Sequence, residues 1–165
     1  MKKMTVFLLL TAILLSLMGC LEQKEPITTP VSFYYPRSEF TYGSTDSVTT
    51  AEVRDAALFS NDHFAILSAY LAGPKKEDLK SPFPTGTTLT QLSVANGTAS
   101  IILSDHIAVL SGIDLTVACV CLTRTIMELT GAKRVEISAE TKLLGGSKSI
   151  TMDSSNVYLS ESSAK

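Results

Sequence analysis

Between residues 31 and 152, apolar and polar positions repeat with the periods of β-strands and of α-helices. The stretch 31–36, VSFYYP, alternates and is rich in aromatic residues, which predicts a strand that ends at Pro36. A weaker strand is predicted over 50–54, TAEVR, and the polar residues 37–48 predict a loop between the two.

The first predicted helix is marked by apolar residues that recur three or four positions apart. Ser60 or Asn61 is the expected N-cap, because a side-chain oxygen there can accept a hydrogen bond from a free backbone N–H group. Gly73-Pro74 is expected to end the helix, since Pro cannot continue the helical hydrogen bonds. Phe64, Leu67 and Leu71 recur at helical spacing, with Ile66 and Tyr70 alongside, and Leu67 and Leu71 are expected in the core.

The second predicted helix is longer and carries one continuous apolar stripe. Ser111 and Asp114 have the spacing of an N-terminal capping box, and Gly131 is expected to end the helix. The stripe consists of Leu115, Ala118, Cys119, Leu122, Ile126 and Leu129.

A β-hairpin is predicted over 88–104, TLTQLSVANGTASIILS. Asn96-Gly97 is the preferred pair for a two-residue type I′ turn, and it makes Ala95 and Thr98 partners. The side chains expected to meet the helices are Leu92, Val94, Ala99, Ile101 and Leu103. The opposite, open face of the hairpin carries Gln91, Ser93, Ser100 and Ile102.

Two more strands, over 133–139 and 149–152, complete the order β-(β)-α-β-β-α-β-(β). Helices with one apolar face and strands with one apolar face pack as two layers. The sequence therefore predicts the α+β class, a two-layer sandwich with two helices on one face of a mostly antiparallel sheet.

The N-terminus has the features of a secretory signal peptide. Lys2 and Lys3 precede an apolar run over 4–18, which is shorter than the roughly 20 residues of a membrane-spanning helix. The run ends Leu-Met-Gly-Cys at 17–20, which resembles the bacterial lipobox, in which the cysteine is acylated and becomes the first mature residue. The alternative is a plain signal peptide or membrane anchor with an incidental Cys20.

This N-terminus predicts a lipoprotein tied by acylated Cys20 (diacylglyceryl and palmitate-type chains) to the outer face of the cell membrane. The expected division of the chain is a signal peptide at 1–19, an acylated linker at 20–30, one domain at 31–152 and a polar tail at 153–165.

Composition argues against several classes of function. Removing Lys2 and Lys3 changes the formal net charge from −2 to −4, and no run of Lys or Arg suggests nucleic acid as a partner. No metal-ligand spacing, phosphate loop or nucleophile elbow occurs, so no metal and no cofactor is expected. Cys119 and Cys121 point about 200° apart on a helix and cannot form a disulfide there.

Candidate catalytic residues are few. Ser104, Asp105 and His106 are neighbours along the chain, and neighbours on extended backbone do not face one another, so they do not predict a triad. His63 is expected at the surface of the first helix. The chain does not resemble an enzyme.

Two residues keep alternative interpretations. Arg54 could bind an anionic ligand or anchor a buried network, or it could be a packing residue paired with Glu52 or Asp55. Ile102 could belong to a binding surface or be covered by the loop 37–48.

Several motifs occur in the order of a known family. AYLAGP closes the first helix, PTGT enters the hairpin at 84–87, NGTASIILS forms its second strand, and GAKRVEI at 131–137 leads into the next strand. This order resembles the GerMN domain of sporulation and spore-germination lipoproteins. The resemblance covers roughly residues 31–152 and implies no catalytic residues.

Two functions follow as hypotheses. The first is a non-catalytic binding or assembly module at the cell wall, acting in sporulation or spore germination and contacting peptidoglycan or another envelope protein. The expected partner surface consists of Gln91, Ser93, Ser100 and Ile102, with Arg54 if its strand joins the same sheet. The alternative is a degenerate enzyme that modifies peptidoglycan.

Overall fold

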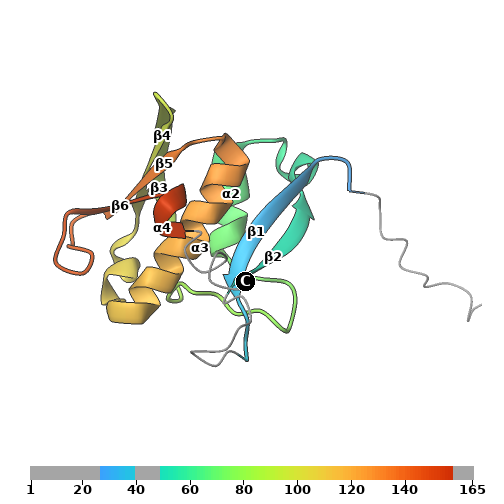
Figure 1. Cartoon of the computed structure of the whole chain (residues 1–165). Coiled ribbons are helices and arrows are strands. Elements are labelled where there is room, and N and C mark those ends of the chain that lie inside the picture. The colour runs from blue at the N-terminus through green and yellow to red at the C-terminus, as the bar shows by residue number, and fades with distance from the viewer. Residues whose placement is uncertain (1–26, 40–48, 158–165) are drawn as a thin grey trace, which may run out of the picture.

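The computed structural model describes residues 27–39 and 49–157 (Figure 1). The predicted order of strands and helices is found, with two short 3₁₀ helices and a final helical turn in addition. The predicted signal peptide and Cys20 lie outside the described residues. The elements are β1 Pro30–Pro36, β2 Thr49–Asp55, η1 Ala56–Phe59, α2 His63–Leu71, β3 Leu89–Ala95, β4 Thr98–Leu103, η2 Asp105–Val109, α3 Gly112–Thr130, β5 Arg134–Ala139, β6 Ser149–Asp153 and α4 Ser154–Val157.

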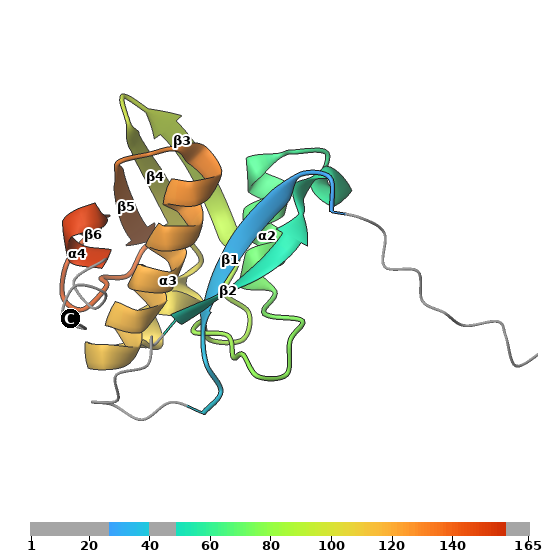
Figure 2. The ribbon, with the colours of Figure 1, turned by 45° about the vertical axis from the view of Figure 1, so that its right-hand side comes forward.

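The strands divide between two sheets. β3, β4, β5 and β6 form a four-stranded sheet in that order, and β1 pairs with β2 in a separate antiparallel sheet. Only the β4–β5 pair is parallel, because α3 carries the chain back to the starting end of the sheet before β5 begins. The α+β class is confirmed, with both long helices against one face of the four-stranded sheet (Figures 1 and 2).

The hairpin has the predicted turn and register. Asn96 and Gly97 have φ values of 52° and 75°, as a type I′ turn requires, and Ala95 pairs with Thr98. Ala99, Ile101 and Leu103 are buried as expected. The prediction was wrong for Val94, which is 45% exposed. Both views show the hairpin tip projecting beyond the end of α3, so no helix covers this residue (Figures 1 and 2).

Helix α2 begins later than predicted and buries a wider face. Its N-cap is Asp62, whose carboxylate accepts a hydrogen bond from the Phe64 backbone N–H at 3.0 Å. Phe64, the first of the three recurring apolar positions, is 41% exposed, whereas Leu67 and Leu71 are buried as expected. The buried positions are Ile66, Leu67, Tyr70 and Leu71. The sheet β1–β2 explains the difference, because the Tyr70 ring stacks on Tyr35 with 4.9 Å between centroids.

Helix α3 is buried on two faces. Its predicted apolar stripe faces the four-stranded sheet, and Gly131 ends it with a φ of 70°. A second face lies against β1, where the Tyr34 backbone N–H donates to Thr125 Oγ1 at 3.0 Å. The predicted capping box is not formed: Ser111 is the N-cap, but its side chain makes no capping hydrogen bond.

Past β6, the chain continues into α4 rather than ending as an extended tail. Val157, the last residue of α4, is buried, and α4 packs against α3 and β6. This part of the predicted tail is therefore attached to the domain.

Candidate functional site

The open face of the four-stranded sheet is the side turned away from α2 and α3. Every side chain on it is exposed or half-buried. We define this open face by its members, which the strand register places in three rows: Ala95, Thr98, Arg134 and Asp153; Ser93, Ser100, Glu136 and Thr151; Gln91, Ile102, Ser138 and Ser149.

The chemistry of the open face is that of a flat surface rich in hydroxyl groups. Seven of its twelve side chains are Ser, Thr or Gln, three are charged, and none is aromatic. Such a surface offers many hydrogen-bonding groups but no enclosed space, which suits a broad polar contact better than a small molecule.

The four predicted hairpin residues lie together on the open face. Gln91 and Ser93 are exposed, and Ser100 and Ile102 are half-buried. Ile102 stands between Gln91 on β3 and Ser138 on β5. Residues 40–48 of the loop proposed to cover it lie outside the described part of the chain. That a partner binds here stays a prediction.

One end of the open face contains a depression of about 400 Å³ beside the hairpin turn. Lys133 and Arg134 bring positive charges to its wall, and Asp153 brings a carboxylate. The hydroxyl and backbone N–H of Ser155 hydrogen-bond that carboxylate and lower the pKa of Asp153 below its usual range. Charge is therefore concentrated at the end near the turn, whereas the other two rows of the face carry a single charged side chain, that of Glu136.

Arg54 does not belong to this surface. It lies on β2 in the other sheet, is only 8% exposed, and forms an ion pair with Glu52 in which Nε and Oε1 are 2.5 Å apart. Its guanidinium also stacks over the Phe33 ring, 4.7 Å from the centroid. Arg54 thus anchors a buried network and is paired with Glu52, not with Asp55, and it is withdrawn from the partner surface.

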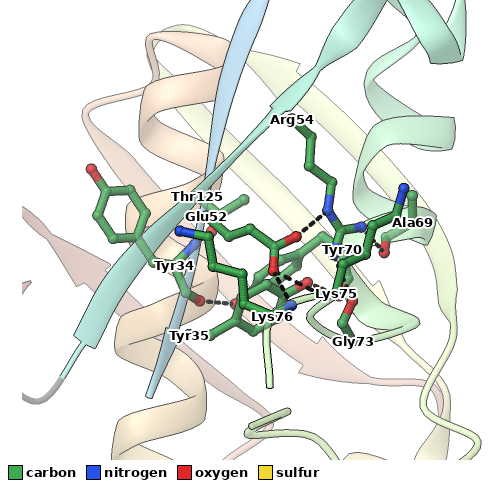
Figure 3. A network of polar contacts seen from close by, with 10 residues as sticks. All are labelled: Tyr34, Tyr35, Glu52, Arg54, Ala69, Tyr70, Gly73, Lys75, Lys76 and Thr125. Atoms are coloured by element: carbon green, nitrogen blue, oxygen red, sulfur yellow. Dashed lines mark hydrogen bonds and ion pairs between the residues drawn. The ribbon is translucent and has the colours of Figure 1, made fainter. Parts of the chain in front are cut away.

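The Arg54–Glu52 pair fastens the end of α2 (Figure 3). Arg54 donates to the carbonyl oxygens of Ala69 and Gly73 at 3.2 and 2.7 Å, which would otherwise lack partners at the helix end. Glu52 Oε2 accepts hydrogen bonds from the backbone N–H groups of Lys75 and Lys76. The LAGP turn is therefore held by two charged side chains from a neighbouring sheet.

This network sets the ionisation of Glu52. Burial alone raises the pKa of a carboxyl group, but hydrogen bonds from Arg54 and from the Lys76 and Lys75 backbones outweigh it and lower the pKa of Glu52. The carboxylate is thus ionised and fully hydrogen-bonded, as a structural ion pair requires.

The tyrosines beside this pair complete the junction between β1 and α2. The Tyr35 hydroxyl donates to the Tyr70 carbonyl at 2.6 Å, and the Tyr70 hydroxyl donates to the Tyr34 carbonyl at 2.9 Å. Burial raises the pKa of both hydroxyls, Tyr35 and Tyr70, well above the usual range, so both remain neutral donors. Their arrangement is that of a buried structural contact.

Ser104, Asp105 and His106 form no triad. Ser104 Oγ lies 3.4 Å from His106 Nδ1, but the Asp105 carboxylate turns to the loop after β5, where it accepts hydrogen bonds from Thr141 and Lys142. Those bonds, from the Thr141 hydroxyl first, lower the pKa of Asp105. Asp105 therefore does not orient the imidazole as the acid of a triad would.

The remaining candidates for chemistry are dispersed. Cys119 and Cys121 are free thiols, and burial raises their pKa values to about 11 and about 12, so neither is a ready nucleophile. His63 is exposed. Across the described residues, no three His, Cys, Asp or Glu side chains are grouped to hold a metal ion. None of the helices described combines the length and apolar character needed to cross a bilayer.

Comparison with known proteins places this fold in a family. The sequence matches the Germane family, described as "Sporulation and spore germination", over residues 32–145. The chain therefore belongs to the Germane family, and the predicted relation to GerMN domains is confirmed. No significant relative was found among curated proteins.

Two solved structures are similar to the chain. The tandem GerMN domains of the sporulation protein GerM from Bacillus subtilis match 68% of this chain at 20% identity, with a TM-score of 0.50. This chain spans 39% of that structure's length, and the likeness shows the fold. A protein assigned as a lipoprotein from Clostridium perfringens matches 77% of this chain and 88% of its own, at 18% identity and a TM-score of 0.49.

Asp55 was expected only as a possible partner of Arg54, and its role as a structural cap was not predicted. Its carboxylate accepts hydrogen bonds from the backbone N–H groups of Thr28, Thr29 and Ala57. The bond from Thr28 contributes most to lowering the pKa of Asp55 to about 2. An available signal was its position directly before the apolar turn AALF, where Asp commonly caps a helix.

Proposed function

We propose that this protein is an extracytoplasmic lipoprotein, anchored by Cys20, whose GerMN domain binds or assembles with a partner at the cell wall during sporulation or germination. Membership of the Germane family supports the setting. The basic start, short apolar run and lipobox-like end of residues 2–20 support the anchor.

The observation that carries the binding role is the open face. Sheet surfaces in small domains are usually covered on the side that bears apolar residues, and here α2 and α3 cover only that side. The other side presents Ser, Thr and Gln around one half-buried Ile102. A polar face with one aliphatic centre suits a moderate, specific contact with a glycan or an envelope protein.

Peptidoglycan provides the direct test of this role. Purified sacculi incubated with the protein should co-sediment it without releasing soluble muropeptides. Ser93 is exposed on the open face, and Ser93→Glu should weaken co-sedimentation. Ser68 is exposed on α2, and the matched change Ser68→Glu should leave co-sedimentation unchanged. If neither substitution changes co-sedimentation and the open face binds no other envelope component, the open face is not the contact surface.

A wall-modifying enzyme remains the second candidate, because Ser104 Oγ and His106 Nδ1 lie 3.4 Å apart on an accessible loop. Release of muropeptides that disappears in Ser104→Ala would establish it. Ser104 also accepts a hydrogen bond from the Thr88 backbone at 3.0 Å, which accounts for its position without catalysis.

The anchor has its own test. Replacing Cys20 by Ser removes the thiol that would be acylated, so the variant should remain as uncleaved precursor or leave the membrane. A Cys20→Ser protein that still partitions into the detergent phase, with its N-terminus cleaved normally, would contradict lipid anchoring.

A further inference from the structure

Three exposed apolar side chains lie on segments that contact one another where the chain enters the domain. Leu58 on η1 is 70% exposed, Phe64 in the first turn of α2 is 41% exposed, and Ile27 at the start of the described chain is 44% exposed. Both views place η1 beside the first residues of β1 (Figures 1 and 2). We call Ile27, Leu58 and Phe64 the tether-end residues.

The backbone holds Leu58 outward in a fixed position. Ser60 and Asn61 both have a φ of 53°, a left-handed conformation that non-glycine residues adopt only when their surroundings enforce it. Their N–H groups donate to the carbonyls of Ala57 and Ala56 at 3.1 and 3.2 Å, which closes the turn around Leu58. The apolar side chain is therefore presented on a rigid turn.

The same turn is fastened to the incoming chain. Asp55 caps η1 through the Ala57 N–H at 3.0 Å, and it also binds Thr28 and Thr29, with N–H to carboxylate distances of 2.9 and 3.0 Å. A single carboxylate thus fixes the entry of the chain beside the turn that carries Leu58. Any anchor that precedes Thr28 must pull on this corner of the domain.

The length of the preceding chain limits how far this corner can lie from the anchor. Seven residue steps separate Cys20 from Ile27, and an extended chain spans at most about 3.6 Å per residue, or about 25 Å in all. If Cys20 is acylated, Ile27 and the corner of the domain that it enters are kept within about 25 Å of the lipid.

We propose that the tether-end residues Ile27, Leu58 and Phe64 insert into the surface of the lipid bilayer and hold the domain in one orientation on the membrane. This inference rests on the proposed lipid anchor. The contact is apolar, since Leu and Phe transfer favourably from water into the interface, and it does not depend on basic residues.

The docked orientation has a consequence for the rest of the molecule. The loop after β5 and the start of α3 lie on the opposite side of the domain from η1 in both views (Figures 1 and 2). Val109, on η2 just before α3, is 71% exposed and provides a matched control for Leu58. Only the η1 end should meet lipid.

An environment-sensitive fluorophore on an introduced cysteine tests the contact in the full acylated protein. Leu58→Cys and Val109→Cys replace side chains of nearly equal exposure. The native thiols Cys119 and Cys121 should stay unlabelled in folded protein at neutral pH, because burial raises their pKa values to about 11 and 12. The labelled proteins are reconstituted into vesicles of phosphatidylethanolamine and phosphatidylglycerol.

The expected result is a blue-shifted emission at position 58 that is quenched by spin-labelled lipid, with no shift and no quenching at position 109. A second variant, Leu58→Asp, should remove the shift from a label placed at Phe64→Cys while the protein still floats with the vesicles. If the protein floats with the vesicles but the labels at positions 58 and 109 are both unquenched, membrane docking is contradicted. Lipid anchoring is not contradicted by that result.

Two other outcomes also overturn the proposal. If the acylated protein does not float with the vesicles, the lipid anchor is contradicted. The argument that the tether-end residues lie near lipid then fails as well. A blue shift at position 58 that rises with the protein-to-lipid ratio, without lipid quenching, shows that a second copy of the chain covers Leu58 instead.

Discussion

On the two-stranded sheet, Glu52 and Arg54 point into the protein and Val53 points out. On the hairpin β3–β4, most apolar residues point toward the helices, and the outward face carries Ser and Gln around Ile102. The first arrangement buries charge and exposes an aliphatic side chain, which is costly unless every charge is paired. The Arg54 network meets that condition.

The contrast separates structural from accessible polar residues. Glu52 and Arg54 on β2 act within the molecule, because their partners are backbone carbonyl and N–H groups at the end of α2 and in the turn after it. Neutral side chains on β3 and β4 face solvent and leave hydrogen-bonding capacity for a partner. In this domain, the charged residue Arg54 is structural, whereas the serines of the open face are the candidate contacts.

Among substitutions by alanine, the largest effect is expected at the buried pair. Arg54→Ala leaves the Glu52 carboxylate buried without its counter-charge and should lower the free energy of unfolding by about 3–5 kcal/mol. Denaturant unfolding measures it. Exposed Arg134→Ala on the open face is the matched control and should stay within about 0.5 kcal/mol. Equal effects at the two arginines would contradict the contrast between the sheets.

The next largest effect on the free energy of unfolding is expected in α3, which contacts both sheets. Leu122 is 1% exposed, and Leu122→Ala should lower the free energy of unfolding by about 2–5 kcal/mol by leaving a cavity. Val94→Ala, at the exposed hairpin tip, should change it by only about 0.5 kcal/mol. An unchanged melting temperature for the Leu122 variant would mean that α3 does not pack as described.

Acid should weaken the two-stranded sheet through Glu52. Its folded pKa lies below the ordinary value of 4.5 despite burial, so the ionised carboxylate contributes stability above pH 4.5. That contribution is lost as the pH falls through the folded pKa. Glu52→Gln should therefore be less stable at neutral pH and lose less stability on acidification, measured by urea unfolding across pH. A variant with the same acid slope as the natural protein would contradict this role.

On β4, the effect on stability should be much smaller at Ile102 than at its neighbour Ile101. Ile101 is 1% exposed toward the helices, whereas Ile102 is half-buried on the open face. Ile101→Asp should abolish folding, and Ile102→Asp should fold but lose its partner in a crosslinking assay. Circular dichroism monitors the folding of both. Loss of folding in both would mean that Ile102 is covered, as the alternative interpretation holds.

Local patterns predicted much of the four-stranded sheet. Asn96-Gly97 dictates its turn, the turn dictates the register, and alternation then assigns the faces, because each step depends on adjacent residues. The separate β1–β2 sheet could not be predicted in this way. Whether β2 joins the other strands depends on contacts between residues far apart in the chain, such as Arg54 with Gly73.

The same limit applies to Phe64. Its spacing with Leu67 and Leu71 predicted one apolar face, but β1 adds a second neighbour and turns the buried face of α2 toward Ile66 and Tyr70. The open face was foreseen because it follows from hairpin alternation. Its extension over β5 and β6 required the parallel pairing that α3 imposes.

Photo-crosslinking on native membranes tests most directly whether the open face is where a partner binds. A photoreactive residue is placed at exposed Ser93 on the open face, and a matched one at Val53, which is 47% exposed on the two-stranded sheet. An adduct with an envelope protein or glycan at position 93 and none at position 53 is the predicted result. An adduct at position 53 alone, or equal adducts at both, would contradict it.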